Sequence, residues 1–225
     1  MNDGVMVFKL CDEISLRLPK LHSNYCLCNS LNLRAFTMRQ NLYMLAIMPP
    51  AALTDEIEHI RHEFAEKYKA VAALKPPVHI TLIPPYKTFP QTEQVLMAAL
   101  QQWASKQDAF PVVLKDYDFF PGNGVVFIDV VRNDRLGAFR KELRQEFLKI
   151  IPASEAKRSS SFHPHITIGY RDIPRELFPD IEREYSSRQF SAEFIADAFY
   201  LWRHTGQRWE TIQSFPLISS GISRE

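Results

Sequence analysis

The 225-residue sequence has few cysteines, no long apolar run and no surplus of charge of either sign. Its longest apolar runs are strand-sized, well short of the roughly 20 residues that a membrane-spanning helix needs, so a membrane-spanning role is excluded. Its 27 basic side chains are balanced by 26 acidic ones, for a formal net charge of +1. The chain therefore lacks the charge surplus that binds a nucleic-acid backbone unselectively, and any RNA contact must be local.

Cysteine is scarce and occurs in an odd number, as Cys11, Cys26 and Cys28. A chain of this length does not need disulfides to hold a core, and the N-terminus has no basic region followed by an apolar run and a cleavage site. We therefore expect a reduced, cytoplasmic protein.

Several catalytic motifs are also missing. The sequence has no glycine-rich phosphate loop, no Gly-x-Ser-x-Gly elbow and, in the part expected to fold, no pairing of a cysteine with a histidine. With 46% hydrophobic and 24% charged residues, the composition is that of an ordinary globular protein of one or two domains.

Residues 1–37 differ in pattern from the rest of the chain. They contain all three cysteines and show neither a sustained helical nor a sustained strand period. Met38 leads into a buried-strand run at 42–48, which Pro49-Pro50 ends. We expect one folded domain at 38–225, preceded by a weakly packed extension at 1–37. The alternative is an N-terminal cap that packs on the domain.

A helical period follows this first strand. Apolar side chains recur at three- and four-residue steps: Ile57, Ile60, Phe64, Tyr68 and Val71. This spacing predicts an amphipathic helix, with Asp55 and Glu56 in its first turn, where the helix dipole favours acidic groups.

The rest of the domain alternates between strand and helix patterns, with a second helical stripe that begins at Asp134 as its N-cap. The expected strands lie at 78–83, 110–120, 125–131, 163–170, 190–202 and 209–217, the further helices at 91–106 and 175–184, and a flexible loop at 152–161.

The two halves of this domain repeat one order of elements: strand, amphipathic helix, His-Ile-Thr strand, short helix, long strand. His79 follows Leu42 by 37 residues, and His165 follows Val125 by 40. Such a repeat predicts two related α+β lobes.

The two His-Ile-Thr segments carry the candidate chemistry. Side chains alternate along a strand, so His79 and Thr81 share one face, as do His165 and Thr167. Two imidazoles at one cleft suit attack at phosphorus, because one can accept the nucleophile's proton while the other protonates the leaving oxygen. The threonine hydroxyls would bind the non-bridging oxygens, and the scheme needs no metal. A single copy would more simply be a histidine bonded to the backbone.

These residues resemble the two-histidine (2H) phosphoesterase superfamily, which includes 2′-5′ RNA ligase-like proteins and RNA 2′,3′-cyclic phosphodiesterases. The resemblance covers about residues 38–218. It implies a bilobal α+β fold with a pseudo-twofold axis, antiparallel sheets that line a central cleft and helices outside, and catalysis without metal or cofactor. It also implies His79 and His165 as the catalytic pair, with His165 as base and His79 as acid, and Thr81 and Thr167 as phosphate ligands.

Further residues are possible substrate contacts, each with a simpler alternative. Tyr86 could stack on a base, or only pack. Arg171, after the second motif, and Lys157 and Arg158, in the loop, could meet a phosphate.

His163 lies two residues before His165 and could be half of a metal site, although it lacks a carboxylate or cysteine at ligand spacing in the sequence, which favours a solvent histidine. Trp202 and Trp209 are expected in the core.

The sequence therefore predicts a monomeric, metal-independent phosphoesterase that hydrolyses, or reversibly ligates, cyclic or 2′-5′ phosphodiesters of RNA ends or nucleotides. Two alternatives are a non-catalytic protein that binds RNA or nucleotides in the same cleft and a metal-dependent hydrolase that uses His163 and His165. The sequence leaves open which RNA end or nucleotide is the substrate.

Overall fold

The computed structural model describes residues 39–152 and 162–219. Contacts divide the chain after Thr37, and the fold below is that of the unit that begins at Met38. The predictions for residues 1–37 and for Lys157 and Arg158 therefore lie outside the described residues. Within the described residues, no helix combines the length and the apolar character needed to cross a membrane.

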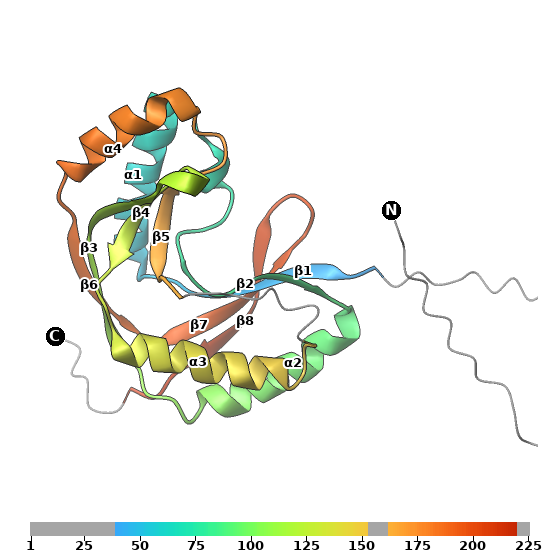
Figure 1. Cartoon of the computed structure of the whole chain (residues 1–225). Helices are drawn as coiled ribbons and strands as arrows, with labels where there is room; N and C mark the ends of the chain where they lie inside the picture. The colour runs from blue at the N-terminus through green and yellow to red at the C-terminus, as the bar shows by residue number, and fades with distance from the viewer. Residues whose placement is uncertain (1–38, 153–161, 220–225) are drawn as a thin grey trace, which may run out of the picture. The chain divides into compact units, whose positions relative to one another are not determined.

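Eight strands form one curled antiparallel sheet in the order β6-β3-β4-β5-β2-β1-β7-β8 (Figure 1). Their bounds are β1 Asn41–Ile47, β2 Ile80–Thr88, β3 Phe110–Phe120, β4 Val125–Val130, β5 His165–Gly169, β6 Ser191–Ala196, β7 Ala198–His204 and β8 Trp209–Pro216. The halves β6-β3-β4-β5 and β2-β1-β7-β8 are joined by one residue pair, Ile80 with Ile166. This arrangement confirms the predicted α+β fold with two related halves.

In the part of the chain that the structure describes, four α-helices cover the outer side of the sheet: α1 Ala51–Tyr68, α2 Pro90–Ala104, α3 Asp134–Leu148 and α4 Phe178–Ser186. Figure 1 shows α1 and α4 together at the top and α2 and α3 together at the bottom. Helices cross between the halves, because α1 follows β1 but contacts β5, and α3 follows β4 but contacts β2 as well as β3. Gly169 allows this approach, since a Cβ there would overlap the Phe64 ring of α1.

The first helix differs from its predicted form at both ends. It begins at Ala51, directly after Pro50, so Asp55 and Glu56 lie in the second turn, and no acidic residue lies in the first. It ends at Tyr68, where Lys69 adopts a left-handed conformation with φ of 57°. Val71 therefore lies beyond the helix and is 53% exposed.

Two other predicted boundaries also need correction. Asn133, not Asp134, caps α3, because its side-chain oxygen accepts a hydrogen bond from the Leu136 N–H at 3.0 Å. The single strand expected at 190–202 is two strands, β6 and β7, which divide at the exposed Asp197. Since β6 pairs with β3 and β7 with β1, the chain passes here from one half of the sheet to the other.

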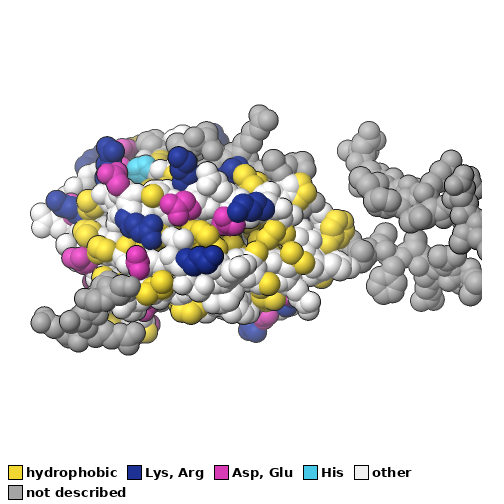
Figure 2. Space-filling view, turned by 90° about the horizontal axis from the view of Figure 1, so that it is seen from below, with side chains coloured by type: hydrophobic (Ala, Val, Ile, Leu, Met, Phe, Trp, Pro, Cys, Tyr) yellow, Lys and Arg dark blue, Asp and Glu magenta, His cyan; other side chains and the backbone are white. Residues whose placement is uncertain are grey.

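The apolar side chains form two clusters. The larger one packs between the sheet and the helices and includes Phe64, Phe139 and Phe199. A smaller one, built on Met44, Ala46 and Trp202, packs separately from it. The outer face on the side of α2 and α3, seen in Figure 2, mixes basic and acidic side chains, as expected from the near-zero net charge.

Candidate functional site

The two His-Ile-Thr segments meet where the halves of the sheet join. His79 directly precedes β2 and His165 opens β5, and the two strands pair antiparallel at Ile80 and Ile166. Continuing this register places His79 opposite Thr167 and Thr81 opposite His165. Both isoleucines are buried in the main core, so side-chain alternation directs both histidines and both threonines to the opposite face.

A cavity of about 920 Å³ lies on this face. His79, Thr81 and Thr167 line it, whereas His165 is not among its lining residues. The His165 ring packs instead against Phe120 and Phe127, with ring centroids at 5.3 and 4.8 Å. The structure thus places three of the four motif side chains in one cavity and the fourth on the adjoining strand.

The cavity is locally basic. Its cationic lining residues are Arg61, Lys75, Lys87 and Arg171, and no carboxylate lines it within the described residues. Opposite charge favours binding of an anion at such a site. The net charge of the chain is only +1, so any RNA contact must be local, and this cavity provides a local site for an anion.

Both histidine rings are held in the same way by backbone carbonyls. His79 Nδ1 lies 2.7 Å from the carbonyl oxygen of Pro77, and His165 Nδ1 lies 2.7 Å from that of His163. A carbonyl can only accept, so Nδ1 carries the proton in each ring. Nε2 is then the nitrogen available to exchange a proton with a substrate or water.

The surroundings lower the pKa of both histidines. Burial is the main cause for His79, and the charge of Arg61 adds to it against the opposing effect of the Pro77 carbonyl, so its pKa falls to about 4. Burial also lowers the pKa of His165, and the charge of His163 adds to this, while the hydrogen bond to the His163 carbonyl and the charge of Asp129 raise it. In the unliganded protein both rings are therefore neutral at pH 7.

Arg61 connects the first motif to helix α1. Its side chain is only 2% exposed and donates to Pro76 O at 2.8 Å and to Glu58 Oε1 at 2.9 Å, while its Nε has no partner. The adjacent carbonyl, that of Pro77, holds the His79 ring. Arg61 therefore fixes the segment that orients His79 and places a positive charge beside it.

A second contact ties the loop before the first motif to the loop after the second. The Asp172 carboxylate accepts hydrogen bonds from the backbone N–H groups of Val71 and Ala72, at 2.8 and 2.9 Å. Asp172 follows Arg171, whose backbone is left-handed with φ of 68°. The contact joins the loops on the two sides of the cavity.

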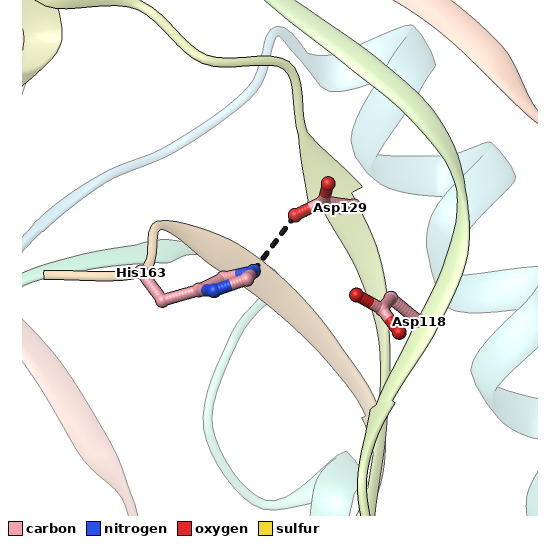
Figure 3. A group of neighbouring side chains, drawn as sticks. All are labelled: Asp118, Asp129 and His163. Carbon is pink, nitrogen blue, oxygen red and sulfur yellow. Dashed lines mark hydrogen bonds and ion pairs between the residues drawn. The ribbon is translucent and has the colours of Figure 1, made fainter.

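Two carboxylates lie near the second motif, although the sequence has none at ligand spacing from His163. His163 Nε2 lies 3.0 Å from Asp129 Oδ1, and one donor atom from each of Asp118, Asp129 and His163 lies within 4.8 Å of the others (Figure 3). The three residues come from β3, β4 and the segment before β5. The sequence has no carboxylate at ligand spacing from His163, and the sheet pairing brings two to it, while the His163 side chain stays exposed as expected.

The remaining sequence candidates have different surroundings. Tyr86 is 2% exposed and packs against Tyr43 and Phe147, and it also lines the cavity, so its role as a substrate contact stays a prediction. Arg171 is exposed and lines the cavity. Trp202 is buried, as expected, whereas Trp209 is only half-buried and lines the cavity.

Sequence reasoning missed Arg61, although a signal for it was present. Arg61 falls on the apolar face of α1, between the buried residues Ile57 and Phe64. A charge at a core position of a helix needs a partner or a function, and that is how it could have been found. Lys75 and Lys87 carried no such signal, because only the fold brings them to the cavity.

Comparison with known proteins agrees with this geometry. The model of the 2′-5′ RNA ligase superfamily matches residues 49–208. The fold is similar to that of TT0787 of Thermus thermophilus, with a TM-score of 0.60 and 19% identity over 80% of this chain and 99% of that one. It is also similar to E. coli LigT in complex with 3′-AMP, with a TM-score of 0.56 and 18% identity over 80% of this chain and 100% of LigT. The comparison with curated protein sequences returned no match.

Proposed function

The chain belongs to the 2′-5′ RNA ligase superfamily, and we propose that it is a metal-independent phosphodiesterase that opens 2′,3′-cyclic phosphates, or cleaves and joins 2′-5′ linkages, at RNA ends or in nucleotides. The observation that carries this proposal is the antiparallel meeting of two His-Ile-Thr segments at Ile80 and Ile166. That crossing gives two imidazoles and two hydroxyls on one face, which is the set of groups that transfer at phosphorus requires.

The cavity supports an anionic substrate. It combines four cationic side chains with the motif residues and has no lining carboxylate among the described residues. E. coli LigT, which shares the fold, has been crystallised with 3′-AMP and with phosphate. We therefore place the scissile phosphate between the motifs, with the Thr81 and Thr167 hydroxyls donating to its non-bridging oxygens.

In hydrolysis, His79 Nε2 accepts a proton from water while the water oxygen bonds to phosphorus. One of the two ring P–O bonds then breaks, and His165 Nε2–H protonates the oxygen that leaves. The product is a phosphate monoester with a neighbouring hydroxyl, and exchange with solvent restores both rings. Ligation is the same transfer with a hydroxyl of a second RNA end in place of water: its oxygen bonds to phosphorus, the ring P–O bond to the 3′ oxygen breaks, that oxygen is protonated, and a 2′-5′ linkage remains. Cleavage of a 2′-5′ linkage is the reverse of this step.

This assignment of roles is opposite to the one that the family resemblance implies. His79 has a pKa of about 4 and stands beside Arg61, so it is the ring that stays neutral and can accept a proton. The charge of Asp129 favours protonation of His165, and the negative charge of an arriving phosphodiester favours it further. The charges thus favour His79 as base and His165 as acid.

The test is a substrate panel assayed with and without EDTA. It contains 2′,3′-cyclic mononucleotides, a 2′-5′ dinucleotide and an oligonucleotide that ends in a cyclic phosphate. We expect turnover that persists in EDTA. Binding without turnover would instead support a non-catalytic RNA-binding protein.

Loss of activity on chelation, restored by a divalent cation, would support the metal-dependent alternative. The grouping of Asp118, Asp129 and His163 is the observation that favours it. The monomeric state and the cytoplasmic setting stay predictions, which gel filtration and localisation of the full chain would check.

A further inference from the structure

One row of side chains crosses the cavity away from the two motifs. In the sheet register Leu42 of β1 pairs with Lys87 of β2 and with His204 of β7, and His204 pairs with Trp209 of β8. All four residues line the cavity. The row therefore spans four adjacent strands on the face that carries the candidate catalytic groups.

The strand register gives the distance between this row and Thr81 of the first motif. Thr81 pairs with Ala46, and Leu42 lies four residues before Ala46 along β1. At roughly 3.3 Å per residue, the row is about 13 Å from the level of Thr81. The oxygens of a phosphate bound by the threonines cannot reach it, so whatever occupies the row is a further part of the substrate.

An apolar floor separates the row from the motif. Met44 and Trp202 pair between the two levels and are 3% and 1% exposed. Trp202 also packs edge-to-face on His79, with ring centroids at 5.2 Å, and the half-buried Trp209 packs against the same small cluster. The cavity extends from His79 to Trp209, and Met44 lines it between them, while the buried Trp202 supports both His79 and Met44 from below the surface.

The ends of the row carry complementary chemistry. Trp209 presents a half-buried indole, with the His204 ring edge-to-face at 5.1 Å, while Lys87 at the other end is exposed. The His204 ring is oriented by the Gly206 N–H, which donates to its Nδ1 at 3.1 Å. An aromatic platform and a cation in one groove are the combination that binds single-stranded nucleic acid, by stacking on a base and pairing with a phosphate. Three strand spacings of roughly 4.8 Å put the two ends of the row about 14 Å apart.

The size of the cavity points the same way. Pockets for drug-sized ligands range over about 300–1,000 Å³, so a cavity of about 920 Å³ lies at the upper end of that range and has room beyond a bound phosphate. We propose that the Lys87–Leu42–His204–Trp209 row binds the nucleotide next to the reacting one in a single-stranded RNA, its base against Trp209 and the linking phosphate at Lys87. This inference rests on the proposed function, and it makes an oligonucleotide end, not a mononucleotide, the preferred substrate.

The kinetic test compares a 2′,3′-cyclic mononucleotide with a tetranucleotide that ends in the same cyclic nucleotide. For the wild-type protein we expect kcat/KM to be about tenfold or more higher for the tetranucleotide, from stacking of one additional base. Trp209→Ala and Lys87→Ala should each reduce this preference, lowering kcat/KM for the tetranucleotide by about tenfold more than for the mononucleotide. Equal kcat/KM for both substrates in the wild-type protein would overturn the proposal.

Matched variants separate stacking and charge from general damage. Trp209→Phe keeps an aromatic face and should retain most of the preference, and Lys115→Ala removes an exposed lysine from β3, on the other half of the sheet. A Lys87→Ala protein whose preference equals that of Lys115→Ala would contradict the role of Lys87. Equal losses in Trp209→Phe and Trp209→Ala would contradict stacking.

A binding measurement keeps this inference distinct from the proposed function. A fluorescently labelled tetranucleotide ending in a 3′-phosphate is titrated with each full-length variant, and anisotropy gives Kd without turnover. Weaker binding by Trp209→Ala than by Trp209→Phe, even if no substrate is turned over, would support the row while the proposed catalysis fails. Unchanged Kd in both Trp209→Ala and Lys87→Ala would overturn the row even if catalysis is found.

Discussion

The two motifs have the same backbone arrangement but different charged neighbours. In both, Nδ1 of the histidine bonds to the carbonyl two residues earlier, which belongs to Pro77 in the first motif and His163 in the second. Near His79 the charge is the buried cation of Arg61, whereas near His165 the charge of His163 is accompanied by the carboxylate of Asp129, which raises the pKa. The repeat therefore supplies two equivalent imidazoles, and their neighbours make them unequal.

This inequality matters because acid–base catalysis needs one neutral and one protonated ring. A cation lowers the pKa of an imidazole and a carboxylate raises it, so the two neighbours act in opposite directions. With His79 as base and His165 as acid, kcat/KM should have its maximum between the two pKa values, which is below pH 6.5. The variants below test this comparison in order of decreasing effect.

Removing either imidazole should have the largest effect. We expect His79→Ala and His165→Ala each to lower kcat for a cyclic phosphodiester by about 10²-fold or more, the usual contribution of a general acid or base. His62→Ala, which removes an exposed histidine of α1, is the matched control and should have wild-type kcat. Near-normal turnover by His79→Ala would show that catalysis does not use two histidines.

The threonines should matter less, because each contributes one hydrogen bond to the phosphate. Thr81→Val and Thr167→Val keep the branched shape and remove the hydroxyl, and we expect each to lower kcat/KM by about tenfold, the value of one hydrogen bond to a charged group. If the two halves of the sheet contribute equally to phosphate binding, Thr81→Val and Thr167→Val should lower kcat/KM by similar factors. A loss confined to one variant would show that only one half holds the phosphate.

Arg61→Met tests the environment of the first motif. It removes a positive charge, so the pKa of His79 should rise from about 4, although burial keeps it below the ordinary value of 6.5. The acid limb of the pH profile should move to higher pH, and kcat/KM at the optimum should fall by up to about tenfold as the Pro76 segment loosens.

Arg61→Lys is the control for charge, and histidine NMR titration of the folded protein is the direct measurement. Lysine keeps the cation but not the forked hydrogen bonds, so the pKa of His79 should stay low. The same rise in both variants would mean that the guanidinium acts through packing alone. A rise in maximal kcat/KM on Arg61→Met would assign His79 as the acid, because the reacting form, with His79 protonated and His165 neutral, becomes more populated as the pKa of His79 rises.

Asp129→Asn tests the second motif and should have the smallest effect. It removes a negative charge that raises the pKa of His165, so this pKa should fall further. The basic limb of the profile should then move to lower pH, with less than about tenfold change in the maximal kcat/KM. Asp118→Asn, a neighbouring carboxylate that does not contribute to the His165 shift, is the control.

Together the Arg61 and Asp129 variants distinguish the two assignments of roles. If His79 is the base, Arg61→Met raises the acid limb and Asp129→Asn lowers the basic limb, so each narrows the pH profile. If His165 is the base, each variant also narrows the profile, because the limbs lie at the same two pKa values, but the reacting form is then the minor one and the maximal kcat/KM rises as the two pKa values approach each other. Profiles that move in neither way would show that these two neighbours do not set the roles.

The sequence by itself determined the elements that local pattern controls. Side-chain alternation put the histidine and threonine of each motif on one face, and the repeat predicted two related halves. The hairpin expected at 110–131 is present as β3 and β4. A local pattern does not show where the chain passes from one half of the sheet to the other. At Asp197 the pattern of one uninterrupted strand is in fact two strands, one in each half.

Only the tertiary structure decided what surrounds each histidine. Arg61 becomes a neighbour of His79 because α1 crosses to the other half and packs on β5, and Asp129 reaches His163 through the pairing of β4 with β5. Trp209 reaches the cavity through three strand pairings. These contacts join residues far apart in the chain, and their energies depend on burial and strand register, which a local sequence pattern does not contain.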